Sequence, residues 1–439
     1  MKHNLKIIVG LGKTGISCVR YLTKQKCNFA VVDSRSHPPA LEELQKKSPS
    51  VPTYLGKIDE NILSQAQELI ISPGVPLSEP AIAACLKRGI EVIGDIELFA
   101  RTANVPIIAI TGSNGKSTVT SLVGEMIKAA GKRVGIGGNL GVPALDLLNQ
   151  NVDFYVLELS SFQLETTVSL KAKAAVVLNI SPDHMDRYQS FNDYLQIKQR
   201  IYTNCQVAII NRDDHLSHAH TNLSQPVISF GSSKPLADDF GIDHGYLMYG
   251  NEKIIPISKL KIKGLHNAIN AVAALALGKA IDLPLQQILS VLYEFPGLPH
   301  RCQWVANING VDWYNDSKGT NVGATTAAIE GLGKEISGKI ILIAGGLGKD
   351  ADFSPLQDVI IKYVKTVVLI GKDAPLIQKT LMGTSKILLA PSMQEAVIIC
   401  AKEASSKDVV LLSPACASYD MFNNFEHRGE LFIEEVKKL

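Results

Sequence analysis

The chain has 439 residues, of which 46% are hydrophobic, and carries a formal net charge of +2 at pH 7. This length exceeds that of one typical domain, so we expect two to four domains with sizeable cores. Lys and Arg are scattered along the sequence, and the balanced charge gives no basis for a nucleic-acid-binding surface. No apolar run approaches the roughly 20 residues of a membrane-spanning helix.

The cysteines and the first residues predict the compartment. Seven cysteines are widely spaced and form no Cys-x-x-Cys pair, which is typical of reduced thiols. Residues 1–10 lack the apolar core of a signal peptide and lead into a predicted strand. We therefore expect a soluble, cytoplasmic protein.

Residues 5–33 have the pattern of strand, glycine turn, helix and strand. The turn is Gly10-Leu-Gly-Lys-Thr-Gly15, and the second strand ends at Asp33, 18 residues after Gly15. A dinucleotide-binding fold places a ribose-binding acid near that position, although a strand-end turn residue explains Asp33 equally well. The pattern predicts a nucleotide-type ligand without identifying it. Residues 72–74 follow another strand and should face the same crevice.

A second glycine-rich turn follows the apolar run Ile107 to Ile110. The loop continues into a predicted helix that ends near Gly131, and its residues are Thr111, Gly112, Ser113, Asn114, Gly115, Lys116, Ser117 and Thr118. Backbone N–H groups and a helix N-terminus hold phosphate oxygens, Lys116 adds a charge, and Ser117 can ligate Mg²⁺. Ile110 stands where the usual P-loop has its first glycine, and an ordinary strand-to-helix turn is the alternative.

Further polar side chains follow the next predicted strands. Glu158 ends a strand at 154–158 and could bind Mg²⁺ directly or through water. His184 follows the strand at 174–180; it is a less usual Mg²⁺ ligand, and a turn or capping role is equally favoured. Lys198 lies on a predicted helix, where a surface position is the default expectation for lysine.

The linkers divide the chain into three predicted domains, 1–97, 98–297 and 298–439. Residues 98–106 form the first break, and Phe295-Pro-Gly-Leu-Pro299 forms the second. Each domain has an α/β pattern with polar groups at strand ends. The simplest interpretation is an ATP-using enzyme whose domains close around two further substrates.

Six motifs resemble the Mur ligase family, in order and over nearly the whole chain. They are Thr111-Gly-Ser-Asn-Gly-Lys-Ser117, Leu157-Glu-Leu-Ser-Ser-Phe-Gln163, Asp183-His-Met-Asp-Arg187, His266-Asn-x-x-Asn270, His300-Arg301 and Asn315-Asp-Ser-Lys-x-Thr-Asn321. The resemblance implies a Rossmann-like N-terminal domain, a P-loop-type central ATP-binding domain and a Rossmann-like C-terminal domain. Within the family, residues 413–429 and the short N-terminal domain are similar to members that join D-glutamate to UDP-N-acetylmuramoyl-L-alanine for peptidoglycan synthesis.

The family mechanism is ATP-dependent amide formation through an acyl phosphate. The resemblance implies that Lys116 and the loop amides hold the ATP phosphates. It places Ser117, Glu158 and His184 around two Mg²⁺ ions and makes Lys198 a carbamylated lysine that ligates the second ion. Lys116, His184 and Lys198 are thus the expected catalytic residues. Asn270, Arg301 and Asp316 match family positions at the ATP base, phosphate and ribose.

The resemblance also implies binding sites for the two other substrates. The UDP positions are Thr14, Asp33, Ser34, Arg35 and Ser72, and Asn139 matches a contact to the sugar-linked part. Lys318 and Thr320 lie on the facing third domain, and the amino-acid positions are Lys349, Ser418 and Phe425. Lys13, Gly319 and Tyr419 depart from familiar residues, which affects individual contacts rather than the reaction. We expect a monomer.

Three alternatives remain from the sequence. A nicotinamide dehydrogenase would use Gly10–Gly15 and Asp33 but leaves Lys116 and the third domain without a role. A non-catalytic ATP-binding module leaves Glu158 and His184 unexplained. Another amino-acid ligase of the same family, including a folylpolyglutamate type, is the nearest alternative, although folate ligases begin with the ATP domain.

Overall fold

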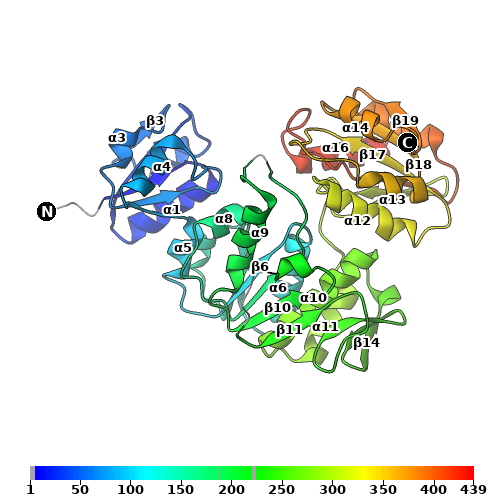
Figure 1. Ribbon diagram of the computed structural model, residues 1–439, viewed down its shortest axis with the longest axis horizontal. Helices are drawn as coiled ribbons and strands as arrows, with labels where there is room; N and C mark the ends of the chain where they lie inside the picture. The colour runs from blue at the N-terminus through cyan, green and yellow to red at the C-terminus, as the bar shows by residue number, and fades with distance from the viewer. Residues whose placement is uncertain (1–4, 186, 220–223) are drawn as a thin grey trace.

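The computed structural model describes residues 5–185, 187–219 and 224–439, which form three successive α/β units (Figure 1). The first unit is blue, the second runs from cyan to light green, and the third runs from yellow to red. Among these residues, no helix combines the length and the apolar composition needed to cross a membrane. The sheets of the three units are separate, as the fold class predicted.

The first unit is a parallel sheet in the order β3-β2-β1-β4-β5. Its apolar strands are buried on both faces, which is typical of a parallel sheet between helices. Its elements are β1 (Leu5–Val9), α1 (Lys13–Lys24), β2 (Asn28–Asp33), α2 (Leu41–Lys47), β3 (Thr53–Leu55), α3 (Glu60–Leu63), β4 (Glu68–Ile71), α4 (Pro80–Lys87), β5 (Glu91–Ile93) and the following helix α5 (Asp95–Ala100).

Helix α1 begins at Lys13, within the stretch Gly10–Gly15 that the sequence predicted as a turn. Gly15 therefore lies inside the first helical turn rather than in the loop. A Cβ atom at Gly15 would stand 1.9 Å from the carbonyl oxygen of Gly10, so glycine is required for this close approach of helix to strand.

The second unit has a six-stranded parallel sheet in the order β11-β10-β9-β6-β8-β7. Strand β6 lies inside this sheet. It leads into α6 through the glycine-rich turn of residues 111–118, which we call the phosphate loop, as the sequence predicted. The elements are β6 (Ile107–Thr111), α6 (Lys116–Ala129), β7 (Val134–Gly138), α7 (Ala144–Leu147), β8 (Phe154–Glu158), α8 (Ser161–Glu165), β9 (Ala174–Val177), α9 (Phe191–Gln199), β10 (Val207–Asn211), β11 (Val227–Phe230), α10 (Leu265–Ala280) and α11 (Leu285–Glu294).

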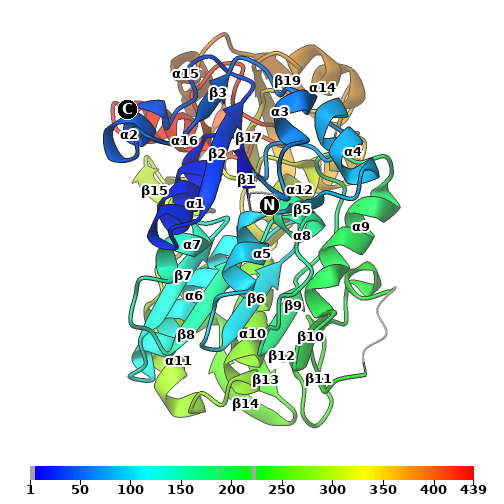
Figure 2. The same cartoon turned by 90° about the vertical axis from the view of Figure 1, so that its left-hand side faces the viewer.

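A small antiparallel sheet, β12 (Phe240–Asp243), β13 (Tyr246–Tyr249) and β14 (Glu252–Pro256), packs against α10. The sequence analysis did not predict these three strands, which are four or five residues long. Their inward residues, including Phe240, Leu247 and Ile255, join the apolar core below α10. Figure 2 shows this sheet at the end of the second unit remote from the other two units.

The third unit is a six-stranded sheet in the order β15-β16-β20-β17-β18-β19, in which β15 alone runs antiparallel to its neighbour. Helices cover both faces around two apolar clusters. The elements are β15 (Gln303–Ile308), β16 (Val311–Asn315), α12 (Val322–Gly333), β17 (Ile340–Gly345), α13 (Leu356–Tyr363), β18 (Val364–Ile370), α14 (Ala374–Thr380), β19 (Lys386–Leu389), α15 (Met393–Glu403), β20 (Val409–Leu412) and α16 (Phe425–Val436).

Helix α5 joins the first two units through a charged cluster. Arg101, just after α5, donates to Glu97 at 2.9 Å, to Glu68 of β4 at 2.7 Å and to Glu91 of β5. The other oxygen of Glu97 accepts the backbone N–H groups of residues 168–169 in the second unit. The cluster therefore ties the edge of the first sheet to the second unit.

We expect Arg101→Met to lower the free energy of unfolding by about 1–3 kcal/mol, because it removes charged hydrogen bonds to Glu68 and to Glu97, which is 2% exposed. Urea denaturation measures the change. Arg88→Met is the matched control, since the Arg88–Glu60 pair is exposed on both sides and should contribute about 0.5 kcal/mol or less. Equal effects of the two substitutions would contradict a stabilising role for the cluster.

Candidate active site

The carboxyl ends of the parallel strands in all three units face three adjoining cavities. Their volumes are about 1070, 330 and 350 Å³, and we call them the first, second and third cavities. Arg301 and Lys318 line all three, so these two cations stand where the cavities meet.

The first cavity lies between the first and second units and reaches the third. It brings together the residues predicted to hold the UDP group and the linked sugar. They are Thr14, Asp33, Ser34, Arg35, Ser72 and Asn139. Lys13 also lines this cavity and donates to the carbonyl oxygen of Gly141 at 2.5 Å, across the boundary between the units. The N-terminus of helix α1 has no side-chain cap, and Gly12, Lys13 and Thr14 at this end of the helix line the cavity.

Asp33 is fully engaged by protein groups. Its Oδ2 accepts the backbone N–H of Leu11 at 2.6 Å and the Arg35 guanidinium at 2.7 Å. Its Oδ1 accepts the backbone N–H and Nε of Arg35 at 2.9 and 2.8 Å. Burial acts to raise the pKa of Asp33, but the bonds from Arg35 and Leu11 outweigh it and lower the pKa. An ionised carboxylate with four donors has little capacity left for ribose hydroxyls, which disfavours the dehydrogenase alternative.

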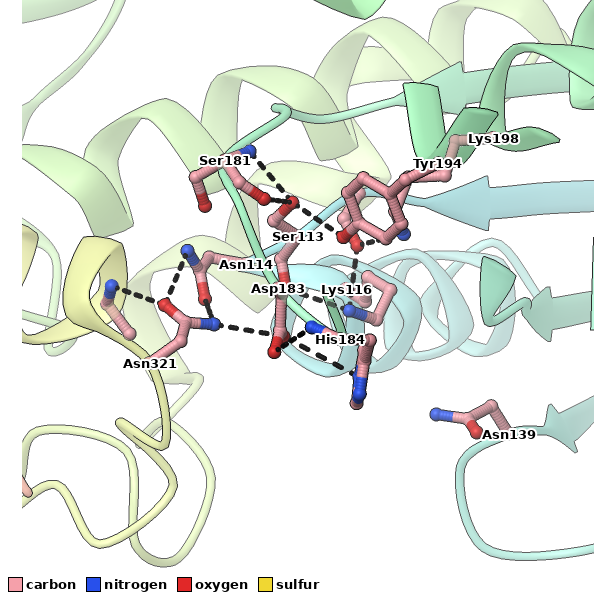
Figure 3. Close-up of polar contacts among 12 residues, drawn as sticks. Ser113, Asn114, Lys116, Asn139, Ser181, Asp183, His184, Tyr194, Lys198 and Asn321 are labelled. Carbon is pink, nitrogen blue, oxygen red and sulfur yellow. Dashed lines mark hydrogen bonds and ion pairs between the residues drawn. The ribbon is translucent and has the colours of Figure 1, made fainter. Parts of the chain in front are cut away.

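Two lysines converge on the phosphate loop (Figure 3). Lys116 Nζ donates to the carbonyl oxygens of Gly112 at 2.8 Å and Ser113 at 2.9 Å, and Lys198 Nζ donates to the same Gly112 oxygen at 2.8 Å. Gly115 has φ 82°, and a Cβ there would stand 2.4 Å from the side-chain oxygen of Asn270. Only glycine therefore fits this turn of the loop.

The expectation that Lys198 is a surface residue is wrong. Its side chain is 2% exposed, and its ammonium group lies 4.9 Å from the centroid of the Tyr194 ring. The helical spacing places Tyr194 and Lys198 on the same inward face of α9. Burial and the neighbouring charge of Lys116 hold the pKa of Lys198 well below that of an ordinary lysine.

Glu158 has the properties of a cation ligand. It is 2% exposed, its Oε1 accepts the side-chain amide of Asn139 at 2.7 Å, and its Oε2 has no hydrogen-bond partner among the described residues. Burial acts to raise its pKa, but the charge of Lys116 and the nearby polar groups of Ser117 and Asn139 lower it. An ionised, buried oxygen without a donor fits a bound cation.

His184 follows strand β9 and has φ 59°, and its Nε2 is 3.6 Å from Asp183 Oδ2. Burial, with the charges of Lys349 and Lys116, lowers its pKa, which leaves a neutral imidazole available as a ligand. In the described part of the chain, no three His, Cys, Asp or Glu side chains gather as a metal site. A Mg²⁺ ion here would therefore take phosphate and water oxygens as well.

The second cavity lies between α10 and α12 and contains most of the predicted ATP residues. They are Asn114, Gly115, Thr118, Asn270, Arg301 and Asp316. Arg301 also donates to Ser117 Oγ at 2.8 Å. Burial raises the pKa of Asp316 to about 6. A Cβ at Gly319 would stand 2.6 Å from both Asp316 Oδ2 and Ser413 Oγ, so this turn of the loop is closely packed.

The third cavity lies between the phosphate loop and the third unit. Its walls contain Ser113, Lys116, Glu158, His184, Lys198, Thr320, Lys349, Ser418 and Phe425, together with the exposed Tyr419. The Lys318 ammonium lies 3.7 Å from the centroid of the Phe425 ring. Among the predicted site residues, Gly112 lines none of the three cavities, and its carbonyl oxygen accepts bonds from Lys116 and Lys198. Asp186, part of one quoted motif, lies outside the described residues.

Three supporting residues escaped the sequence analysis. Asn179 exchanges hydrogen bonds with the backbone of Asn114 at 2.8 and 3.0 Å, and Tyr194 bonds Ser113 Oγ at 2.9 Å. Arg428, 0% exposed, donates to Ser317 and to the carbonyl oxygen of Cys416, which holds the Asp316–Lys318 loop. Asn179 had a sequence signal, its place at a strand end, but the partners of the other two come from distant segments.

Comparison with known proteins places all three units in one family. Residues 4–94 match the Mur ligase MurD-like N-terminal domain, residues 110–278 the Mur ligase middle domain, and residues 300–416 the Mur ligase glutamate ligase domain. UDP-N-acetylmuramoylalanine–D-glutamate ligase of Coxiella burnetii (strain Dugway 5J108-111) is 53% identical over 100% of this chain and 99% of the relative. The ligase of that name from Pseudomonas fluorescens (strain Pf0-1) is 50% identical over 99% and 98%.

Solved structures match the whole chain at lower identity. A pseudomurein peptide ligase type C from Methanothermus fervidus has a TM-score of 0.63 at 16% identity and 99% coverage of both chains. The UDP-N-acetylmuramate-alanine ligase of Thermotoga maritima has a TM-score of 0.62, also at 16% identity and 99% coverage of both chains. These similarities show a common fold.

We expect Lys318 to make nucleotide affinity depend on pH. Burial and the neighbouring Arg301 lower the pKa of Lys318 to about 8, so its positive charge is present at pH 7 and lost by pH 9. The affinity for Mg–ADP should therefore fall about tenfold between these values. Calorimetric titration of the wild type and Lys318→Met measures this, and the variant should bind more weakly at pH 7 with a smaller slope. The same slope in both proteins would contradict the role of Lys318.

Proposed function

Because this chain belongs to the Mur ligase family, we propose that it is an ATP-dependent ligase that adds D-glutamate to UDP-N-acetylmuramoyl-L-alanine for peptidoglycan synthesis. Relatives with that ligase name align with nearly its full length. The observation that carries the proposal is the junction of three cavities at Arg301 and Lys318. Such a junction lets a nucleotide sugar, ATP and an amino acid bind side by side.

In this proposal the first cavity holds the UDP-linked substrate. The open N-terminus of α1 and the Arg35 guanidinium favour the charged nucleotide, while Thr14, Ser34 and Ser72 offer hydroxyl groups. Asp33 acts mainly by fixing Arg35. Asn139 lies where this cavity meets the phosphate loop and orients Glu158 as well as the sugar-linked part.

ATP occupies the second cavity with its phosphates on the loop. Asn270 and Asp316 contact the base and ribose, and Arg301 reaches the phosphates together with the loop amides from Gly112 to Thr118. Lys116 leaves its carbonyl partners to meet the phosphate charge, since a lysine side chain rotates freely and its ammonium group donates three bonds.

Ser117, Glu158, His184 and Lys198 hold two Mg²⁺ ions in this proposal. The free Oε2 of Glu158 and the neutral His184 support it. When bound, the ions neutralise phosphate charge in the reaction. Lys198 carries a carbamate: its neutral amine adds CO₂ and releases one proton, which converts the amine into an anionic oxygen ligand. The low pKa of the Lys198 amine favours that addition at neutral pH.

The reaction then has two steps. A carboxylate oxygen of the nucleotide substrate attacks the γ-phosphorus, ADP leaves, and an acyl phosphate forms. The amine of D-glutamate attacks the acyl carbon, and phosphate leaves with the amine proton. Lys116, Arg301 and Lys318 offset the charge that develops. Lys349, Thr320, Ser418 and Phe425 in the third cavity hold the glutamate, whose carboxylates suit the Lys349 ammonium.

We also propose domain boundaries at 1–97, 98–297 and 298–439, with a cytoplasmic, monomeric protein. Separate sheets in the three units support these boundaries, although the first falls within α5. All seven cysteines are free thiols, which suits a reducing compartment.

An amino-acid panel tests the function. With UDP-N-acetylmuramoyl-L-alanine and ATP, we expect phosphate release with D-glutamate and little with L-glutamate, L-alanine, L-lysine or diaminopimelate. Release with another amino acid would assign a different ligase of this family. Release that needs neither of the other substrates would contradict the ligase proposal.

The carbamate predicts a rescue experiment. Lys198→Ala should lose most activity, at least a hundredfold, and bicarbonate or a short carboxylic acid should partly restore it by supplying the oxygen ligand. Lys128→Ala is the control, because Lys128 is exposed and pairs only with Glu125 among the described residues. Near-normal turnover of Lys198→Ala would refute the role, and a complete loss that no carboxylate rescues would refute the carbamate.

A further inference from the structure

Asn321 connects the third unit directly to the phosphate loop. It lies immediately before α12, and its side chain points across the boundary toward the second unit (Figure 3). The residue is 8% exposed, so its amide is largely removed from water. A buried amide of this kind needs partners for both its oxygen and its nitrogen.

Both ends of the amide are engaged. The oxygen accepts the backbone N–H of Ala324 at 2.8 Å and so caps α12. The nitrogen donates to Asn114 Oδ1 and to Asp183 Oδ2, each at 3.2 Å, and Asn114 returns a longer bond at 3.5 Å. One side chain thus links the helix cap of the third unit with two segments of the second.

These two segments carry the chemistry assigned to the second unit. Asn114 belongs to the phosphate loop, between Gly112 and Lys116. Asp183 precedes His184, accepts its backbone N–H at 3.0 Å and lies 3.6 Å from its Nε2. A donor fixed to the third unit therefore sets the position of groups beside both the phosphates and the proposed metal ligand.

The third and second units are closely packed beside the Asn321 hydrogen bonds. A Cβ at Gly323 would stand 3.0 Å from Ser181 Oγ and 3.5 Å from the side-chain nitrogen of Asn114. The first turn of α12 therefore rests directly on the second unit, next to the Asn321 contacts.

We propose that Asn321 is a positioning residue that makes the phosphate loop and the Asp183–His184 segment competent when the amino-acid-binding unit docks. This inference rests on the proposed function. Through this bridge, phosphoryl transfer becomes efficient in the arrangement that also brings Lys349 and Ser418 to the loop. The coupling restricts ATP use to molecules whose third unit is in place.

The amide is the side chain that this role requires. Serine and aspartate are also good helix caps, so capping alone does not demand asparagine. Serine is too short to reach Asp183, and aspartate would bring a second carboxylate to it in place of a donor. Substitution by serine or aspartate therefore keeps the capping of α12 but removes the hydrogen bond that Asn321 donates to Asp183.

The test compares Asn321→Ser, Asn321→Asp and Asn321→Ala with the wild type. Asn321→Ser should keep the wild-type melting temperature and the KM for the UDP-linked substrate, while kcat for phosphate release falls at least tenfold. Asn321→Asp should lose more, and Asn321→Ala should lose stability as well. Wild-type kcat in Asn321→Ser would overturn the proposal, because only the cap would then matter.

Glu335→Ala is the matched control. Glu335 accepts the backbone N–H of Gly264 at 2.9 Å, so it also joins the second and third units, but none of its described hydrogen bonds involves the phosphate loop. Its kcat should stay within twofold of the wild type. An equal loss in Glu335→Ala and Asn321→Ser would show a general docking effect and overturn the specific role.

A second readout does not depend on the identity of the substrates. Amide hydrogen exchange should become faster in residues 112–115 and 183–185 of Asn321→Ser, and should be unchanged there in Glu335→Ala. Unchanged exchange in Asn321→Ser would overturn the inference even if the ligase function holds. Faster exchange, in a protein that fails the amino-acid panel, would retain the inference and reject the substrate assignment.

Discussion

The structure of the site depends on two lysine amino groups that approach one carbonyl oxygen. Lys116 and Lys198 both donate to Gly112 within 2.8 Å, and Arg301 and Lys318 stand nearby where the cavities meet. Like charges at this spacing repel strongly in a low-dielectric site. The arrangement is tolerated because burial drives Lys198 toward its neutral form and because Glu158 and Asp183 supply opposite charge. This cluster of basic side chains is suited to binding a polyanion, and the surrounding structure holds the side chains together.

The three units are joined in two physically different ways. One apolar cluster runs from Ile8 and Val31 of the first unit to Tyr155 and Ala175 of the second, and the Phe99 ring packs 4.9 Å from that of Tyr155. Among the residues that the structure describes, the apolar clusters of the third unit contain no buried residue of the other two. It meets the second unit through polar contacts at the site such as Arg301–Ser117.

This difference has a consequence for motion. Separating an apolar cluster exposes hydrocarbon to water and costs free energy in proportion to its area. Polar contacts are replaced by contacts with water, so their net contribution is about 0.5–1.5 kcal/mol each. The third unit can therefore move relative to the second more easily than the first unit can. Residues from the third unit complete the second and third cavities, so docking of this unit on the second determines whether these cavities are fully formed.

The glycine motif of the first unit shows how a familiar pattern can carry a different function. Gly15 permits helix and strand to approach, as it does in dinucleotide-binding folds. Asp33 occupies nearly the expected position, yet its oxygens are committed to Arg35 and Leu11. Asp33 therefore holds the Arg35 guanidinium in place, and that positive charge suits a charged nucleotide rather than ribose hydroxyls.

The sequence alone determined the class of fold and the position of the phosphate loop. Apolar runs, glycine turns and the Lys116–Ser117 pair are local signals, because strand burial and loop geometry depend on neighbouring residues. The longer motifs carried the family resemblance and most of the candidate residues. Tertiary structure alone decided that Lys198 is buried, that Asp33 is engaged, and that Asn321, Tyr194 and Arg428 support the site. Lys198, Asn321, Tyr194 and Arg428 depend on partners many residues away, and Asp33 accepts from Leu11, 22 residues before it, as well as from the neighbouring Arg35. A single sequence does not encode the distant partners in any local pattern.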